Sequence, residues 1–469
     1  MLNICWTIDP SLSTPLYLQL YEQLKQDIIT QALPADSKLP SIRDIAQALA
    51  ISKTTVESAY QQLEMEGYIY ARKKVGYFAC DLSHSSWHHD EPAPFAEVPR
   101  PEETSAIRYD FSNDSIDPDS FDFTLWRKYV NQTLASDTSR FFDYGDPMGA
   151  YELRYELAKY LHRSRQVRCT PEQIVIGAGT QVLLNLLCGL IKPLHHRIGF
   201  EEPGFAYGRY VFQDQGFGIT PIPLEADGLS LEHLKASALD LVYVSPSNQF
   251  PTGAVMPIQK RLALLEWMQA RDGLIIEDDY DSELRYFGRP IPSMQGLDGG
   301  RSVVYIGSFS KLLLPALRIS YMVLPPKLLP VLQQKIAFYN QTASLVEQLT
   351  VARFMADGQL DKQIRKTRKI YARKNQLLLE QLQAVMGDKI RILGKETGLH
   401  VLLEVLSDQD SQTLTRAAAS IGIKVTPLSD YTFDPQSAPE HPLVIMGYGG
   451  IHSEQIAPAV RMLNEVWFG

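Results

Sequence analysis

The chain has 469 residues, of which 45% are hydrophobic and 21% charged, and its net charge is −9. A chain of this length is too long to fold around a single hydrophobic core, so we expect two or three domains. No apolar run approaches the roughly 20 residues of a membrane span, and the first residues lack the pattern of a signal peptide, which together predict a cytoplasmic protein. The negative charge argues against nonspecific nucleic-acid binding by the whole chain, although it is compatible with a local site.

The first eighty residues predict three helices followed by a hairpin of two short strands. Apolar residues recur at four-residue spacing within residues 15–31, which indicates the first helix. Ser41 and Ser52 stand where they can cap the second and third helices. Strands are expected at residues 68–72 and 76–79, after the third helix.

Small polar and cationic side chains occupy the outward face of the third helix and the turn of the hairpin. Such side chains can contact base edges in a major groove and the neighbouring phosphates. This composition favours DNA binding over a protein-contact module or a solvated three-helix cap. The predicted DNA-binding residues are Arg43, Ser52, Lys53, Thr54, Thr55, Ser58, Lys73, Lys74 and Gly76.

Residues 81–108 are predicted to form a linker. The stretch is polar and rich in proline, without helical or strand periodicity. His84, His88 and His89 lie in it, and we interpret them as solvated because no cysteine or fixed scaffold accompanies them. The sequence therefore predicts no metal site.

From Tyr109 onward, short apolar runs alternate with amphipathic segments. This alternation indicates an α/β fold with a mostly parallel sheet, in which the carboxyl ends of the strands carry the chemistry. Buried strands are expected at residues 173–176, 198–200, 240–244, 274–276 and 303–306.

Polar or aromatic residues that suit pyridoxal 5′-phosphate (PLP) follow each of the five strands. Lys311 would form a Schiff base with PLP, Asp278 would pair with its ring nitrogen, and Arg318 would neutralise its phosphate. Each residue alone could be an ordinary surface, loop or packing residue. The complete series in this order favours a PLP site. The predicted cofactor-binding residues are Lys311, Asp278, Tyr280, Phe205, Thr180, Gln181, Gly179, Asn248, Ser308, Ser310 and Arg318.

These motifs resemble a known family. Residues 39–46 (LPSIRDIA) and 52–56 (SKTTV) are similar to the winged-helix domain of GntR-type bacterial regulators. Residues from about 110 to 469 are similar to a fold-type I aminotransferase, and the whole chain resembles the MocR subfamily of GntR-type regulators. The resemblance implies a winged helix-turn-helix domain (α+β) at 1–80 and an aminotransferase-like domain at 109–469, with a large mixed-sheet part and a small C-terminal α+β subdomain from about 331.

The resemblance also implies partners. Tyr144 matches the family tyrosine that reaches the cofactor of the other subunit, which implies a homodimer, domain-swapped and head-to-tail. The partners expected are operator DNA and a small effector. Members of the subfamily respond to GABA, taurine, D-alanyl-D-alanine or PLP itself, so an amino acid, another amine, a dipeptide or the cofactor all stay open as effectors.

The sequence departs from aminotransferases at the substrate carboxylate. Those enzymes hold it with an arginine in the C-terminal domain, whereas residues 424–450 contain no arginine. In the GABA-responsive member of the subfamily an arginine lies where Asp430 stands. Asp430 either favours an amine-bearing ligand or is only a loop carboxylate; with Tyr207 it is a predicted effector residue. We therefore expect a PLP-dependent regulator without established catalysis, the alternative being an active aminotransferase with an accessory DNA-binding module.

Residues 361–374 form a basic run on an expected helix. One interpretation is an ordinary solvated helix. The other is a nonspecific contact to DNA bent around the dimer.

Overall fold

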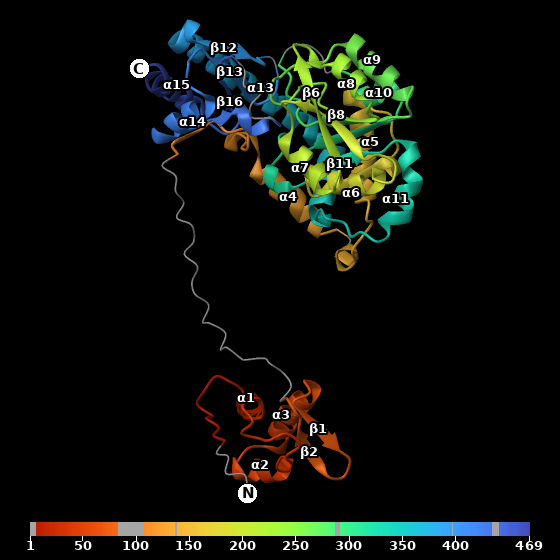
Figure 1. The fold of residues 1–469 in the computed structure, drawn as a ribbon, viewed down its shortest axis with the longest axis vertical. Helices are drawn as coiled ribbons and strands as arrows, with labels where there is room; N and C mark the ends of the chain where they lie inside the picture. Colours follow the sequence, from red (N-terminus) through yellow and green to blue (C-terminus); the bar gives the residue numbers. More distant parts are fainter. Residues whose placement is uncertain (1–5, 83–106, 137, 287–290, 396, 434–439) are drawn as a thin grey trace. The chain divides into compact units, whose positions relative to one another are not determined.

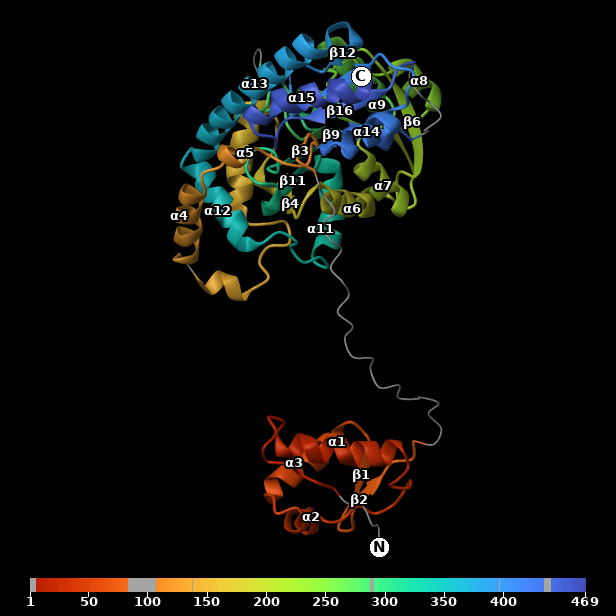
Figure 2. The same cartoon turned by 90° about the vertical axis from the view of Figure 1, so that its left-hand side faces the viewer.

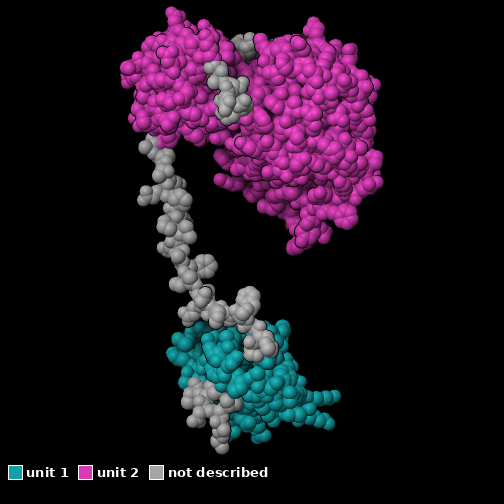
Figure 3. Space-filling model, viewed as in Figure 1, with its two compact units in different colours: residues 1–102 teal, residues 103–469 magenta. Residues whose placement is uncertain are grey.

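The computed structural model describes residues 6–82, 107–136, 138–286, 291–395, 397–433 and 440–469. Two compact units divide the chain, Met1–Glu102 and Glu103–Gly469 (Figure 3). Most of the predicted linker lies outside the described residues, and so do His84, His88 and His89, so the predicted domain limits stay predictions. No helix in the described ranges is long and apolar enough to cross a membrane.

The N-terminal unit is a three-helix bundle with an antiparallel hairpin (Figure 1). The Ser41 hydroxyl accepts from the Asp44 amide at 3.2 Å, and the Ser52 hydroxyl accepts from the Thr55 amide at 3.1 Å. Both predicted caps therefore form, and Gly67 follows the third helix with φ +79°. The elements are α1 (Leu16–Ile29), α2 (Ile42–Ala48), α3 (Lys53–Met65), β1 (Ile69–Arg72) and β2 (Gly76–Ala79).

The second unit is built on an eight-stranded sheet in the order β4-β11-β10-β9-β8-β5-β6-β7. Its five central strands, from β10 to β6, are parallel, and the remaining pairings are antiparallel. All five expected strands form, which confirms the predicted mostly parallel sheet. The strands are β4 (Ile174–Gly177), β5 (Arg197–Glu202), β6 (Gly218–Glu225), β7 (Gly228–Leu229), β8 (Leu241–Val244), β9 (Leu274–Asp279), β10 (Val303–Ser308) and β11 (Ser320–Val323).

Helices cover both faces of this sheet (Figures 1 and 2). Neighbouring residues of β9 alternate between two hydrophobic clusters, because successive strand side chains point to opposite faces. One face packs α6 (Thr180–Ile191), α7 (Ala206–Asp214) and α11 (Leu329–Ile336). The other face packs α8 (Leu231–Ser237), α9 (Ile258–Gln269) and α10 (Met294–Asp298), while α4 (Phe123–Leu134), α5 (Tyr151–Arg165) and α12 (Leu345–Ala356) join a third cluster.

A smaller four-stranded antiparallel sheet lies in the C-terminal part, in the order β12-β13-β16-β15. The short pair β3 (Tyr109–Asp110) and β14 (Ile423–Lys424) joins the start of this unit to its C-terminal part. The start of the small subdomain, expected at about residue 331, stays a prediction. Helix α11 joins the cluster on one face of the large sheet, and α12 contacts α4, α5 and α13 (Gln359–Met386). Further elements of this unit are α14 (Ser411–Ser420), α15 (Ser453–Phe468), β12 (Ile390–Leu393), β13 (His400–Val405), β15 (Thr426–Pro427), β16 (Leu443–Gly447) and the short helix η7 (Leu428–Tyr431).

The basic run on α13 is partly structural. Lys374 is buried, forms an ion pair with Asp117 and donates to the carbonyl of Ile451 at 2.5 Å. Arg368 donates to the carbonyl of Glu283 at 3.0 Å. Neither interpretation of the sequence foresaw these internal contacts, which bury Lys374 and tie Arg368 to the loop after β9.

Candidate functional site

The polar groups after the five predicted strands gather around one cavity. Four of these strands run parallel in the sheet, and β4 has the same direction because two antiparallel pairings separate it from β10. Their carboxyl ends therefore meet at one edge, as in other α/β sheets. The cavity, of about 220 Å³, is lined by Asn113, Asp114, Thr180, Phe205, Tyr207, Phe250, Asp278, Tyr280, Ser308, Ser310, Lys311 and Tyr431.

Lys311 lies in the loop after β10 and lines this cavity. Its Nζ donates to the backbone carbonyl of Asn113. Burial lowers the pKa of Lys311, while the carboxylates of Asp281 and Asp114 oppose that shift. A lowered pKa increases the neutral fraction of the amine, which is the nucleophilic form needed to attack an aldehyde.

Asp278, at the end of β9, is buried beside an aromatic layer. Its Oδ2 accepts from the Tyr243 hydroxyl at 2.6 Å, and the Phe205 ring stacks on the Tyr243 ring with centroids 6.2 Å apart. Burial raises the pKa of Asp278 to about 7, helped by the neighbouring Asp279 carboxylate. A positively charged ring nitrogen placed here would favour the carboxylate form.

Asn248 is held from three sides. Its Nδ2 donates to the Tyr280 hydroxyl at 3.0 Å and to the Asp281 carboxylate at 2.8 Å, and the Thr397 hydroxyl donates to its Oδ1 at 2.7 Å. Tyr280 thus accepts from an amide and keeps its own proton for a donor role. This geometry suits a phenolic oxygen on a bound ring.

A second pocket adjoins the cavity and has the donors of a phosphate site. Its described lining includes Gly179, Thr180, Gln181, Ser308, Ser310 and Arg318. Gly179 has φ +104° and precedes α6, and a Cβ on it would lie 2.2 Å from Arg318 Nη2. Only glycine therefore lets the guanidinium approach the helix start, where backbone N–H groups favour anions. Hydroxyls, a guanidinium and a helix N-terminus fit a phosphate, while Lys311 and Asp278 fit the aldehyde and ring nitrogen of PLP.

Four lining residues were missed by the sequence reasoning: Asn113, Asp114, Phe250 and Tyr431. Phe250 and Tyr431 form an edge-to-face pair with ring centroids 4.8 Å apart. Asn113 and Asp114 follow the two-residue strand β3, far from Lys311 in sequence. Phe250 lies two residues after Asn248 and Tyr431 directly follows Asp430, so both stood beside residues that the sequence analysis had predicted.

The predicted effector and dimer residues lie in different settings. Tyr207 is 56% exposed and lines the cavity. Asp430 is exposed and its Oδ1 accepts from Gln412 at 3.3 Å, whereas its neighbour Tyr431 lines the cavity. Tyr144 is 85% exposed and is absent from the described lining of the cavity in its own chain. The roles predicted for these residues stay predictions.

In the N-terminal unit, the predicted DNA-binding residues lie on α2, at the start of α3 and on the hairpin. Arg43, Lys53 and Thr54 are exposed, as are Lys73 and Lys74 of the hairpin turn. Thr55 and Gly76 are half-buried, while Ser52 and Ser58 are exposed. The Ser58 hydroxyl donates to the Thr54 carbonyl at 2.9 Å, which leaves it an acceptor.

Comparisons with known proteins match both units. Residues 16–78 match the gntR family of bacterial regulatory proteins, and residues 112–439 match aminotransferase class I and II. The HTH-type transcriptional regulator YhdI of Bacillus subtilis is 40% identical over 98% of this chain and 97% of its own. The "Probable rhizopine catabolism regulatory protein MocR" of Rhizobium meliloti is 30% identical over 98% and 95% of the two chains.

The chain belongs to the MocR-type GntR regulators. It is accordingly a DNA-binding transcriptional regulator with a winged helix-turn-helix and an aminotransferase-like domain, which confirms the predicted fold class and family. Kynurenine aminotransferase of Pyrococcus horikoshii, solved in complex with PMP, has the same fold, with a TM-score of 0.70 and 24% identity over 78% of this chain and 91% of its own. Within the described residues of this regulator, no cluster of three or more His, Cys, Asp or Glu side chains could hold a metal ion.

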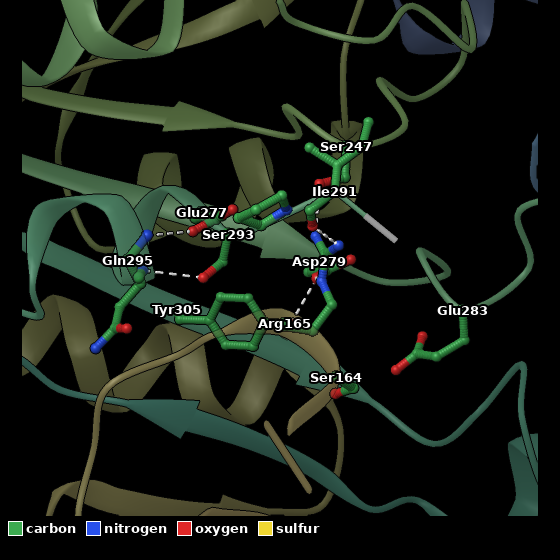
Figure 4. Close-up of polar contacts among 12 residues, drawn as sticks. Ser164, Arg165, Ser247, Glu277, Asp279, Glu283, Ile291, Ser293, Gln295 and Tyr305 are labelled. Atoms are coloured by element: carbon green, nitrogen blue, oxygen red, sulfur yellow. Dashed lines mark hydrogen bonds and ion pairs between the residues drawn. The ribbon is translucent and has the colours of Figure 1, made fainter. Parts of the chain in front are cut away.

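Beneath the site, the MocR-type regulator has a buried ionic network. Arg165, at the end of α5, pairs with Asp279 at 2.6 Å and donates to the Ser247 hydroxyl at 2.6 Å (Figure 4). The Tyr305 hydroxyl donates to the same Asp279 oxygen at 2.5 Å. Asp279 and Ser247 are the chain neighbours of Asp278 and Asn248, so this network fixes the backbone that carries two predicted cofactor residues.

Replacing Asp278 by asparagine is expected to stabilise the unliganded regulator at high pH. The native pKa of about 7 exceeds the ordinary 3.8, so the folded state binds more protons between these values and stability falls as pH rises through that window. Asparagine does not titrate, so the variant avoids this loss. Its free energy of unfolding should exceed that of the wild type by up to about 4 kcal/mol above pH 7 and should equal it near pH 4. Urea unfolding at several pH values measures this difference in unfolding free energy. The exposed control Asp272→Asn should not change the profile, and equal stabilities of Asp278→Asn and wild type at pH 8 would contradict the expectation.

Proposed function

We propose that the second unit binds PLP and senses a small amine, and that the winged helix converts this signal into altered operator binding. The supporting observation is that Lys311, Asp278 and the phosphate-type donors around Gly179 open onto adjoining pockets. These groups are of the kinds that would hold the aldehyde, the ring nitrogen and the phosphate of one flat cofactor.

In this proposal, PLP supplies an aldehyde that reacts with amines and a ring that withdraws electrons. Lys311 offers the amine that holds the aldehyde, and the effector amine competes with it. Asp278 balances the charge on the ring nitrogen, and Phe205 covers the ring face. Ser308, Ser310 and Arg318 hold the phosphate, while the Tyr280 hydroxyl donates to the ring oxygen.

The dimer belongs to the same proposal. Tyr144 is almost fully exposed on its own chain, which is compatible with a place at the cofactor of a partner subunit. A linker over residues 81–108 lets each N-terminal domain reach the other subunit, and cytoplasmic location follows from DNA binding. An effector that binds one arrangement of the dimer more tightly shifts the population toward it, which changes how the two α3 helices meet DNA.

Sensing is favoured over turnover by residues 424–450, which contain no arginine to hold a substrate carboxylate. Because the second unit is similar to aminotransferases, transfer of an amino group from a ligand to the cofactor stays chemically feasible. Steady turnover of an amino donor with a keto acid, at ordinary enzyme rates, would favour the enzyme instead.

The test is an amine titration of the full chain loaded with PLP. We expect the visible absorption band of the bound cofactor to shift over the same concentration range in which the affinity for operator DNA changes. PLP itself, added to cofactor-free protein, provides the comparison for a cofactor-level sensor. If no visible band forms in the wild type, the PLP assignment is wrong.

Replacing Lys53 by alanine is expected to weaken DNA binding without changing the band. Lys53 is exposed at the start of α3, where its charge suits a phosphate. Loss of one phosphate contact weakens binding to all sequences and reduces the slope of log K against log salt by about 1. Fluorescence anisotropy across a salt series measures this slope. Lys25→Ala, on α1, is the control, and an unchanged slope in Lys53→Ala would remove Lys53 from the interface.

A further inference from the structure

We propose that the effector is a diamine-type compound: a primary amine with a second positive charge a few bonds away, in place of a carboxylate. This inference rests on the proposed function, because it names the ligand class of the same cavity. It is carried by the position of Asp114, a carboxylate that lines the cavity together with Lys311 and the rings of Tyr207, Phe250 and Tyr431.

Asp114 lies on the side of the cavity where the amine would react. The Lys311 Nζ donates to the carbonyl of Asn113, the residue directly before Asp114. Burial lowers the pKa of Lys311, and the Asp281 and Asp114 carboxylates both oppose that shift, which places Asp114 within electrostatic reach of Lys311. A ligand whose first amine replaces Lys311 therefore has its next atoms beside this carboxylate.

A ligand carboxylate at that point would meet a like charge, whereas a cation would meet an opposite one. The Asp114 side chain is 80% exposed, and its Oδ2 is 4.0 Å from Lys424 Nζ. That distance exceeds a direct hydrogen bond, and Lys424 is also 3.9 Å from Asp110. A ligand ammonium can therefore take the place beside Asp114, while Lys424 stays near Asp110.

Aromatic rings line the same side. Tyr431 and Phe250 meet edge to face at 4.8 Å, and Tyr207 also lines the cavity. Tyr207, Asp114 and Tyr431 all line the cavity, and burial raises the pKa of Tyr431, with smaller contributions from Tyr207, Asp114 and Asp430. Aromatic faces attract ammonium groups through the negative charge of the ring face. Among the described residues lining this cavity, Lys311 is the sole cation, so a ligand carboxylate would find no other positively charged side chain there.

The experiment compares three ligands with four carbon atoms each on the full chain loaded with PLP: 1,4-diaminobutane, butylamine and 4-aminobutanoate. The readouts are the half-saturation concentration of the visible band shift and of the change in operator affinity. We expect 1,4-diaminobutane to act at a roughly 10-fold lower concentration than either of the others, with the advantage shrinking as salt is raised.

Single-residue variants test which side chains contribute to binding of the diamine. Asp114→Asn should lower the affinity for 1,4-diaminobutane to that for butylamine, while Asp119→Asn, an exposed acid in the same segment, should keep the preference. Lys424→Gln should strengthen diamine binding, because it removes a competing cation. Tyr431→Leu should weaken diamine binding more than Tyr431→Phe, which keeps the ring.

The outcomes separate the two proposals. Absence of a visible band in the wild type would overturn the proposed function and this inference with it. A band that responds equally to the three ligands, or best to 4-aminobutanoate, would overturn the inference alone. Loss of the diamine preference in Asp430→Asn but not in Asp114→Asn would also overturn it, because the ligand cation would then lie beside Asp430.

Discussion

Replacing Lys311 by alanine is expected to abolish the visible band of bound PLP and the response of operator binding to amines. Lys311 is the one amine among the described residues lining the cavity, and burial lowers its pKa toward the neutral, reactive form. Alanine leaves no group to link the aldehyde covalently. Operator affinity without effector should stay within about 2-fold, because α3 lies in a separate compact unit.

Two variants sharpen this expectation. Lys311→Arg keeps a positive charge, but a guanidinium remains protonated and forms no such link, so the band should be lost as in Lys311→Ala. Lys159→Ala is the control, because Lys159 is an exposed lysine on α5 that pairs with Glu156 at 2.8 Å. Absorption spectra after PLP loading and anisotropy with and without amine measure both effects. A full band in Lys311→Ala would assign the cofactor amine to another lysine.

The strand-end residues could be predicted because periodicity located the strands, and parallel strands bring their carboxyl ends to one edge. Asn113 and Asp114 could not be predicted as lining residues, because they follow a two-residue strand that pairs with β14, more than 300 residues later in the chain. The sequence also could not show which of the neighbours Asp430 and Tyr431 lines the cavity. Adjacent residues of a short helix point in different directions, and here tertiary contacts turn Tyr431 toward Phe250 and Asp430 toward Gln412.

Strand β6 was missed for a different reason. It contains Pro221 and Pro223, and proline is rare in sheet interiors because it cannot donate to a neighbouring strand. β6 pairs with β5 on one side, and only its end meets the two-residue β7 on the other, so it behaves as an edge strand. The prolines therefore mark the edge of the sheet, and they do not exclude a strand.

Replacing Arg165 by methionine is expected to destabilise the second unit by about 3–5 kcal/mol, because it leaves a buried carboxylate without its partner. Arg165 and Asp279 side chains are each 2% exposed and lie 2.6 Å apart, and Arg165 also donates to Ser247 and to the carbonyl of Ile291. Glu277 and Glu283 add negative charge around the guanidinium. The expected loss is a large fraction of the 5–15 kcal/mol that stabilises a typical domain.

The same helix supplies a matched control. Arg163, two residues earlier, pairs with Asp361 at 2.7 Å, but its side chain is 65% exposed, so Arg163→Met should cost about 0–1 kcal/mol. Adding Asp279→Asn to Arg165→Met should recover part of the loss, since the unpaired charge disappears. Urea unfolding measures all four proteins, and PLP absorption reports whether Asp278 and Asn248 keep their places. Equal losses for Arg163→Met and Arg165→Met would mean that water reaches Asp279 and that burial of the pair does not govern stability.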